Sequence, residues 1–414
     1  MYLWRRCLAI AAVTCVALHA RAQDCVPTAI KLSISPQMLQ FDNHGQGFVS
    51  SLYHDDLSAL LELSRQWTAC ITQDVNAPVR LLSLGTQAFL AFRLQFANAY
   101  VLHEYAHAES AWRLQLAHIR VGTNDGSPIT AAPYLANLAR MAFDPRQIGD
   151  MGRRGVSVAW DNLPLAPPSL TQLHAAGLNL NSYLAWQSFV SMVHGDASPS
   201  RAMGYAINKW FSPVYFEMDQ RIGGDPSTYI EDLAAQGIQT NKSAIQQVQL
   251  AAALLSNGMW TSARTLLRYG DATSAVAPLH WTATVPATAQ DLTIYWPEFS
   301  SYLNQRGVSL GSEVALAVAS HQGWTLGLER NVIGQDQGTD VSVGLRQTWG
   351  AMTLSGRITH NQGNAFASMD AQYRLNSQAG VTALVYRAQG DTLVGQRLAF
   401  RSNNGGYLGL IIYL

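Results

Sequence analysis

The sequence predicts an α+β multidomain fold, in which a mainly α-helical N-terminal domain is followed by a C-terminal eight-stranded antiparallel β-barrel. Two patterns along the 414 residues carry this prediction. Apolar residues recur at helical spacing from about residue 55 to 268, and after about Gly307 the period changes from 3.6 to 2. We therefore expect the helical domain at 23–270, a connector at 271–310 and the barrel at 311–414.

The composition excludes several classes of protein. The chain carries 27 Lys and Arg against 27 Asp and Glu, and only 13% of its residues are charged, whereas a soluble domain usually has about 25%. The zero balance argues against a nucleic-acid partner, because nucleic-acid-binding surfaces are usually basic. With 48% hydrophobic residues the chain is not compositionally disordered. Its body contains no apolar run of about 18 residues, as a membrane-spanning helix would need.

Residues 1–22 have the pattern of a secretory signal peptide. Arg5 and Arg6 precede an apolar stretch at Cys7–Leu18, and Ala20 and Ala22 supply the small residues of a cleavage site. The stretch is too short for a transmembrane anchor. We therefore expect the chain to be exported.

Two cysteines remain once the signal peptide is removed, Cys25 and Cys70. In an oxidising compartment an even pair most simply forms one disulfide, so we expect a Cys25–Cys70 bond. The sequence has no CxxC pair, which argues against a cysteine zinc site and against thiol redox chemistry.

The helical half opens at Asp55–Trp67, where acidic residues precede leucines in amphipathic spacing. A very long helix is expected from Val79 to about Val121, with Gly85 as its only break. Shorter helices follow at Pro133–Ala142, Leu180–Val193, Arg201–Arg221, Pro226–Gln236 and Ser243–Leu267. Residues 271–300 form a mixed connector interrupted by three prolines.

The C-terminal part contains eight alternating segments separated by turns rich in Gly, Asn and Gln. Segments of this length in a row predict an up-and-down barrel. The expected strands are Ser312–His321, Trp324–Val332, Thr339–Trp349, Met352–His360, Ala365–Asn376, Gly380–Gln389, Val394–Ser402 and Tyr407–Leu414.

The two faces of these strands differ in polarity. Met352, Leu354 and Ile358 share one face of their strand, while Thr353 and Arg357 share the other. Acidic and basic residues together on an inner face are typical of a small barrel with ion pairs inside and lipid outside. The expected inner set is Glu313, Glu329, Arg346, Arg357, Asp370, Arg374, Arg397 and Arg401.

By this pattern, residues 311–414 resemble the small eight-stranded outer-membrane β-barrels. The resemblance implies outer-membrane lipid as a partner and places the helical domain in the periplasm, on the same side as the C-terminus. A soluble periplasmic barrel with an apolar interior is the alternative, because it would produce the same alternation.

The chemical motif stands on the long helix, where His103-Glu104-Tyr105-Ala106-His107 occurs. Residues four apart lie on one helix face, so both imidazoles can reach one tetrahedral ion. Glu104 stands beside the first of them and can take a proton from a water whose pKa zinc lowers toward about 7. The motif resembles the HExxH signature of zincin-type metallopeptidases. The resemblance implies one Zn²⁺ per chain, with His103 and His107 as ligands and Glu104 as general base.

The third metal ligand stays open. Ser110 and Arg113 stand where metzincins carry Gly and His, which excludes that clan and favours a gluzincin-like site with a carboxylate from a later segment. Glu217 and Asp225 are equal candidates, and His194 ranks behind them.

Two further observations bear on this choice. Asp225 follows a glycine pair that lets the backbone approach a site, but Asp225 is also expected as a helix N-cap with Pro226 at the first helical position. Glu109 lies nearest in sequence but points round the helix from His107.

These observations predict a zinc-dependent endopeptidase of the bacterial cell envelope that hydrolyses peptide bonds in a peptide or protein substrate. The alternative is a non-enzymatic outer-membrane barrel protein, acting in assembly or binding, with a structural or inactive metal site. The sequence has no GxSxG, GxGxxG or P-loop motif that would suggest different chemistry.

Overall fold

The computed structural model describes residues 31–34, 47–114, 116, 120–123, 134–143, 156–159, 165–222, 224–271, 276–285, 290–318, 322–336, 338–361, 364–389 and 404–413. The signal peptide, Cys25, the expected strand Val394–Ser402 and the expected inner residues Arg397 and Arg401 lie outside these ranges.

The helical part consists of α3–α10 within the described residues. Helix α4 (Ala77–Arg113) runs through Gly85 without a break. It ends before the predicted Val121, which lies in a strand, Arg120–Thr123. The expected helix at 243–267 is two helices, because the backbone of Ser256 is extended (ψ 134°). The remaining bounds are α3 Gly47–Ile71, α5 Tyr134–Phe143, α6 Pro167–Val193, α7 Pro199–Ile222, α8 Asp225–Ala235, α9 Lys242–Leu255 and α10 Asn257–Leu266.

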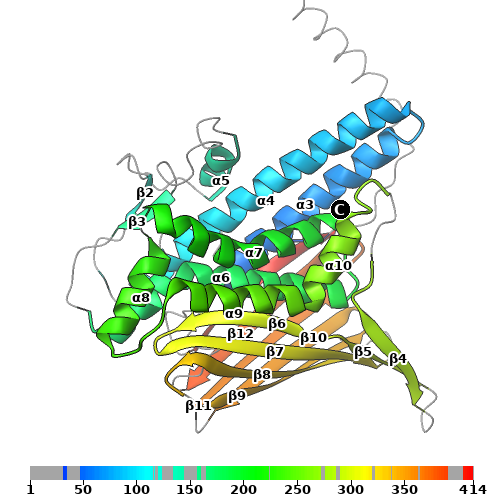
Figure 1. The fold of residues 1–414 in the computed structure, drawn as a ribbon. Helices are drawn as coiled ribbons and strands as arrows, with labels where there is room; N and C mark the ends of the chain where they lie inside the picture. The colour runs from blue at the N-terminus through cyan, green and yellow to red at the C-terminus, as the bar shows by residue number, and fades with distance from the viewer. Residues whose placement is uncertain are drawn as a thin grey trace, which may run out of the picture.

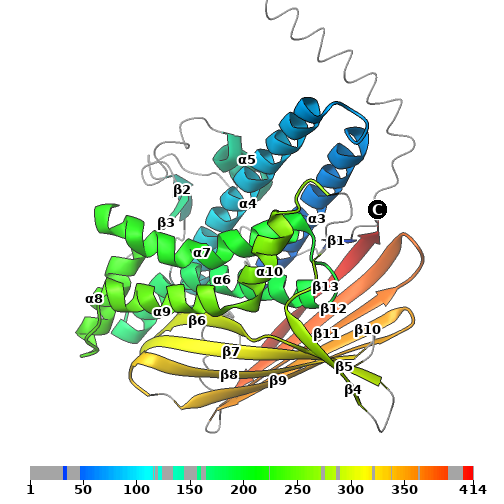
Figure 2. The ribbon, with the colours of Figure 1, turned by 45° about the vertical axis from the view of Figure 1, so that its right-hand side comes forward.

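The helices form a layer over one side of a large curved antiparallel sheet (Figures 1 and 2). One hydrophobic cluster joins the two layers, with Leu102 from α4, Leu184 from α6 and Phe366 and Leu384 from the sheet. No helix in the described part of the chain is long and apolar enough to cross a membrane.

The strands of the large sheet follow the order β1-β13-β12-β11-β10-β9-β8-β7-β5-β4, and a separate two-stranded sheet pairs β2 with β3. Seven of the eight expected strands are present, and the expected connector supplies three more, β4 to β6. The bounds are β1 Lys31–Ile34, β2 Arg120–Thr123, β3 Val156–Ala159, β4 His280–Val285, β5 Gln290–Tyr295, β6 Glu298–Asn304, β7 Gly307–Val318, β8 Gln322–Gly334, β9 Thr339–Trp349, β10 Met352–Asn361, β11 Asn364–Arg374, β12 Ala379–Gln389 and β13 Asn404–Tyr413.

The expected closed eight-stranded barrel is wrong for the described strands, which form an open sheet. Closure would require the last strand to pair with the first strand of the predicted set, β7. Instead β13 pairs with β12 and β1, while β6 and β5 occupy successive parts of the free side of β7. The coarser prediction of a helical part followed by an antiparallel sheet is confirmed.

Side chains from the helices bond the backbone at two borders of the sheet. Asn179 of α6 donates to the carbonyl of Leu303 in β6 (2.6 Å) and accepts from its N–H (2.8 Å). At the other border the N–H of Ser33 in β1 donates to Oδ1 of Asp56 in α3 (2.7 Å). Both borders thus have backbone groups satisfied by the helical layer rather than by another strand.

The inner face of the sheet carries most of the expected charged set. Glu313 and Glu329 are buried, and they line a cavity under the helices together with Arg346, Arg357 and Asp370. Arg374 departs from the prediction, because it lies exposed at the end of β11. Its guanidinium donates to two turn carbonyls, those of Asn376 and Ser377, and lies over the Tyr413 ring.

Candidate metal centre

The HExxH motif lies in the second half of α4, where every residue from Val101 to Ala111 is buried. Small side chains allow this close packing, since Ala99, Ala108 and Ala111 are fully buried against neighbouring elements. Buried polar groups need partners, because a buried imidazole or carboxylate without one is costly. The partners of His103 and His107 therefore define what this site can hold.

Both imidazoles point their Nε2 atoms at one carboxylate oxygen. Oδ2 of Asp225 lies 3.1 Å from Nε2 of His103 and 3.1 Å from Nε2 of His107. The two Nε2 atoms are 3.3 Å apart. Three possible ligand atoms, two nitrogens and one oxygen, thus lie within 4.8 Å of one another. This donor set matches that of a metal site with three protein ligands and a remaining position for water.

The other ring nitrogens are engaged by helix α6. Nδ1 of His103 lies 2.9 Å from Oδ1 of Asn181, and Nδ1 of His107 lies 2.8 Å from the carbonyl of Leu173. Oxygen acceptors at both positions favour an Nδ1–H tautomer, which leaves each Nε2 lone pair for a metal. Asn181 is itself held, since its amide donates to the carbonyl of Ala99 and to Asn208.

Gly177 allows α6 to approach the first histidine. A Cβ at this position would lie 2.5 Å from both Nε2 and Cδ2 of His103. Any larger residue would therefore displace the imidazole or the helix. The glycine is required here by close packing, not by backbone conformation.

Asp225 is brought to the histidines by the start of α8. Gly224 is the N-cap, Asp225 is the first helical residue and Pro226 follows it. The prediction of Asp225 as the N-cap is wrong by one residue, since Gly224 is the N-cap and Pro226 is the second helical residue. From the first helical position the Asp225 side chain reaches the site. A helix N-terminus favours a carboxylate, because the first backbone N–H groups and the helix dipole stabilise negative charge there.

The electrostatics of the cluster are strongly coupled. Burial alone would raise the pKa of Asp225, but the two imidazoles outweigh it and hold the pKa well below the usual range. Burial would lower the pKa of His107, yet the charge and hydrogen bond of Asp225 raise it to about 9, while burial lowers the pKa of His103. The cluster therefore favours a positive charge beside Asp225, which a proton or a divalent cation can supply.

Glu104 is buried beside the cluster and interacts electrostatically with His107 and Asp225. Burial raises its pKa to about 8. A carboxylate with an affinity for protons near neutral pH suits a group that accepts and returns a proton. This is the arrangement expected of the motif's acidic residue.

Two tyrosines next to His103 were not singled out from the sequence. The Tyr215 ring stands edge-on to the His103 ring at 5.5 Å, and the Tyr100 ring is stacked on it at 6.5 Å. Burial, with the charges of Glu104 and Asp225, raises the pKa of both phenols. The sequence gives a signal only for Tyr100, which precedes His103 by three residues on the same helix face.

The other candidate ligands lie outside the cluster. Glu217 is exposed on α7, where its nearest polar partner is Gln246 at 3.5 Å. His194 directly follows α6 and lines the cavity next to the sheet. Its ring lies close to β8, since a Cβ added to Gly323 would be 3.0 Å from it. Glu109 is buried on α4 but is not part of the group that could hold an ion. Of the predicted alternatives, only Asp225 joins His103 and His107.

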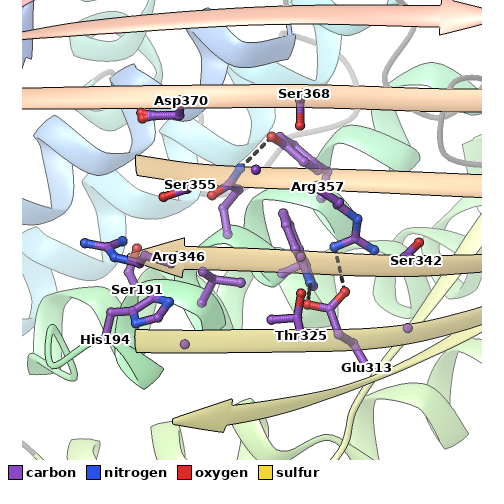
Figure 3. A pocket seen from close by; sticks show the side chains of 18 of the residues that line it. Ser191, His194, Glu313, Thr325, Ser342, Arg346, Ser355, Arg357, Ser368 and Asp370 are labelled. Carbon is purple, nitrogen blue, oxygen red and sulfur yellow. Dashed lines mark hydrogen bonds and ion pairs between the residues drawn. The ribbon is translucent and has the colours of Figure 1, made fainter. Parts of the chain in front are cut away.

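A second polar region, a cavity of about 310 Å³, lies between α6 and the inner face of the sheet. Figure 3 shows its floor of serine, threonine and charged side chains. Arg357 donates to Oε2 of Glu313 (2.6 Å), and the indole of Trp186 donates to Oε1 of the same carboxylate (3.1 Å). These groups pair with one another, unlike those of the metal centre, where three donor atoms converge on one point.

Cys70 takes part in a disulfide bond. The expected partner, Cys25, lies outside the described residues, so the pairing stays a prediction.

Comparison with known proteins adds no family to these observations: no family model, curated protein or solved structure matches the chain.

Proposed function

We propose that the chain is a zinc-dependent endopeptidase of the bacterial cell envelope. The observation that carries this proposal is the convergence of Nε2 of His103, Nε2 of His107 and Oδ2 of Asp225 on one position, next to buried Glu104. Two imidazoles and one carboxylate with an open position form a donor set typical of hydrolytic zinc sites. The predicted signal peptide supports the cell-envelope location.

When bound, the zinc ion would act as a Lewis acid, making water a nucleophile at neutral pH and polarising a peptide carbonyl. The chain's own groups have defined tasks beside it. Asn181 and the carbonyl of Leu173 fix the two imidazoles through Nδ1. Glu104 accepts the proton of the attacking water and passes it to the leaving amine. The Tyr215 ring stands edge-on to the His103 ring and helps to hold it in place.

The decisive experiment compares Glu104→Gln with the unmodified chain in a protein-cleavage assay. Glutamine keeps the size of the side chain but cannot accept a proton, so we expect normal zinc content and cleavage reduced about 10²- to 10⁴-fold. Glu217→Gln is the matched control, because it makes the same change at an exposed position outside the cluster.

Two results would count against the proposal. Undiminished cleavage by the zinc-loaded Glu104→Gln variant would remove Glu104 from the mechanism. Stoichiometric zinc binding without chelator-sensitive cleavage of casein or of a whole proteome digest would favour the alternative, a structural or inactive metal site.

A further inference from the structure

The outer face of β8–β13 is the side of the sheet that points away from the helices (Figure 2). It carries a large exposed apolar surface. Its side chains stand at alternate positions and match across strands, as in the row Leu326, Val343 and Ile358. Their exposed fractions run from 37% for Met352 to 70% for Leu408. The exposed large apolar residues of this face are Leu326, Leu328, Val341, Val343, Leu345, Trp349, Met352, Ile358, Met369, Tyr373, Val381, Val385, Leu408 and Leu410.

The polarity of the sheet is the reverse of that expected in water. The inner face is buried and carries Glu313, Arg357 and a series of serines and threonines, as Figure 3 shows. Its buried apolar residues Phe366, Leu384 and Tyr386 pack in the hydrophobic cluster shared with the helices. The outer face is exposed and apolar. A soluble sheet places its apolar side toward the core, and contiguous exposed apolar surface of this extent marks an interaction site. The soluble barrel with an apolar interior therefore does not fit the inner face.

The apolar surface has defined borders along the strands. Arg330, His360 and Arg387 are exposed near one end of β8, β10 and β12. Each lies one row of outward-facing residues nearer to Trp349 than the one before, so this border crosses the strands obliquely. At the other end Trp349, Met352 and Tyr373 form one row across three strands. None of the described outward-facing positions of β8–β13 between these borders carries a charged side chain.

Along β10 the distance between the borders is close to the height of the apolar band of a membrane strand. Met352 and His360 are eight positions apart there, or about 27 Å at about 3.4 Å per residue, whereas in β12 Val381, in the row of Tyr373, and Arg387 are six positions apart, or about 20 Å. The apolar band of membrane strands is about 25 Å tall and is edged by aromatic residues, because Trp and Tyr favour the level of the lipid headgroups. The strands of this face, at 10–13 residues, are long enough for that band even when tilted.

We propose that the outer face of β8–β13 contacts the hydrocarbon core of a lipid bilayer, with Trp349 and Tyr373 at one headgroup level and Arg330, His360 and Arg387 at the other. The helical layer would then shield the polar inner face from lipid. Asn179 and Asp56 already bond edge backbone groups of β6 and β1, which could not stay unpaired in hydrocarbon. This proposal is independent of the metal centre, so His103→Ala should not affect it.

The direct test places a nitroxide label on Val343→Cys, inside the apolar face and one row from that of His360, and on Leu267→Cys, an exposed position of the helical part (88% exposed). The full chain is reconstituted into dioleoylphosphatidylcholine vesicles. Oxygen concentrates in hydrocarbon and a nickel chelate stays in water. We expect oxygen to relax the label at 343 more than nickel does, and the reverse at 267. Equal access of nickel to both positions would overturn the proposal.

A second test changes the face itself. Val343→Lys puts a charge in the band, and Val214→Lys makes the same change on α7 at a similar exposure, 48% against 43%. We expect Val343→Lys to reduce the vesicle-bound fraction in flotation at least about tenfold, since a lysine on the lipid-facing side of a membrane strand is unfavourable, and Val214→Lys to leave it unchanged.

Retained zinc binding shows that the helical part of Val343→Lys is folded. If Val343→Lys loses zinc, its flotation result is set aside and the nitroxide measurement alone tests the bilayer proposal. A lipid-free dimer in which the label at 343 is shielded from both reagents would assign the face to a second copy of the chain and refute the bilayer proposal.

Discussion

The helical layer contains two kinds of fully buried histidine, and they differ in what surrounds the ring. His54 of α3 has its nitrogens 2.8 Å from Oγ of Ser188 and 3.3 Å from the amide of Asn98. Burial lowers its pKa to about 4, so it stays neutral. His103 and His107 instead direct one nitrogen each at Asp225 and anchor the other to α6.

This difference shows that burial alone does not make a histidine a ligand. The rings of His54 and His103 are equally inaccessible, yet His54 is satisfied by neutral partners that leave no position for a cation. Convergence on a carboxylate, together with acceptors behind each Nδ1, distinguishes the metal centre.

Of the changes that test this comparison, removal of the Asp225 carboxylate should have the largest effect on zinc binding. In Asp225→Ala the two imidazoles keep their α6 contacts but lose the negative charge, so zinc binding should be lost at micromolar metal. Inductively coupled plasma mass spectrometry of the purified chain measures it. Glu217→Ala is the control and should retain one zinc per chain. Zinc loss in Glu217→Ala with retention in Asp225→Ala would show that Glu217, not Asp225, is the third ligand.

Because His54 is buried in its neutral form, the free energy of unfolding should fall in acid. Its folded pKa of about 4 lies below the unfolded value near 6.5, so its contribution is complete above pH 6.5 and is lost as pH falls toward 4. The loss amounts to about 3 kcal/mol at pH 4. Chemical unfolding curves between pH 7.5 and 4 should show a weaker pH dependence for His54→Gln. Parallel curves for both chains would contradict the neutral, buried state of His54.

The smallest effect on zinc binding is expected for Asn181, which contacts His103 but is not itself a proposed ligand. Asn181→Ala removes the acceptor of the His103 Nδ1–H without touching the three donor atoms, so zinc affinity should fall about 10- to 100-fold while stoichiometry is kept. Competition with a chromophoric chelator measures this, and Asn179→Ala, on the same helix but facing β6, is the control. An unchanged dissociation constant would show that Asn181 does not orient His103.

The sequence was sufficient to predict that His103 and His107 of the candidate metal centre lie together, because the two residues are related by the helical repeat alone. It could not separate Glu217 from Asp225, because the choice depends on how α7 ends and α8 begins. Asn181 was not identified, since an asparagine at one position of a long apolar helix has no local pattern. The need for glycine at position 177 was not predictable either, because it comes from close contact with the His103 ring of another helix.

The strands of the C-terminal part were predictable from alternation, but their closure was not. Period-2 patterns and short turns specify neighbouring hairpins, and those are present from β7 to β12. Whether the first and last strands meet depends on contacts between distant segments. The pairing of β6 and β5 with β7, and of β1 with β13, has no counterpart in any local pattern.

The pairing of β1 with β13 has a consequence for the order in which the molecule is completed. Lys31 lies opposite Tyr413 and Ile34 opposite Leu410, so one border strand is drawn from the beginning of the chain and its neighbour from the end. Contacts across such a separation form late, because the loop between them must be closed first. The residues of the metal cluster are synthesised well before that moment. We therefore expect the pairing of β1 with β13 to be among the last contacts that the sheet forms.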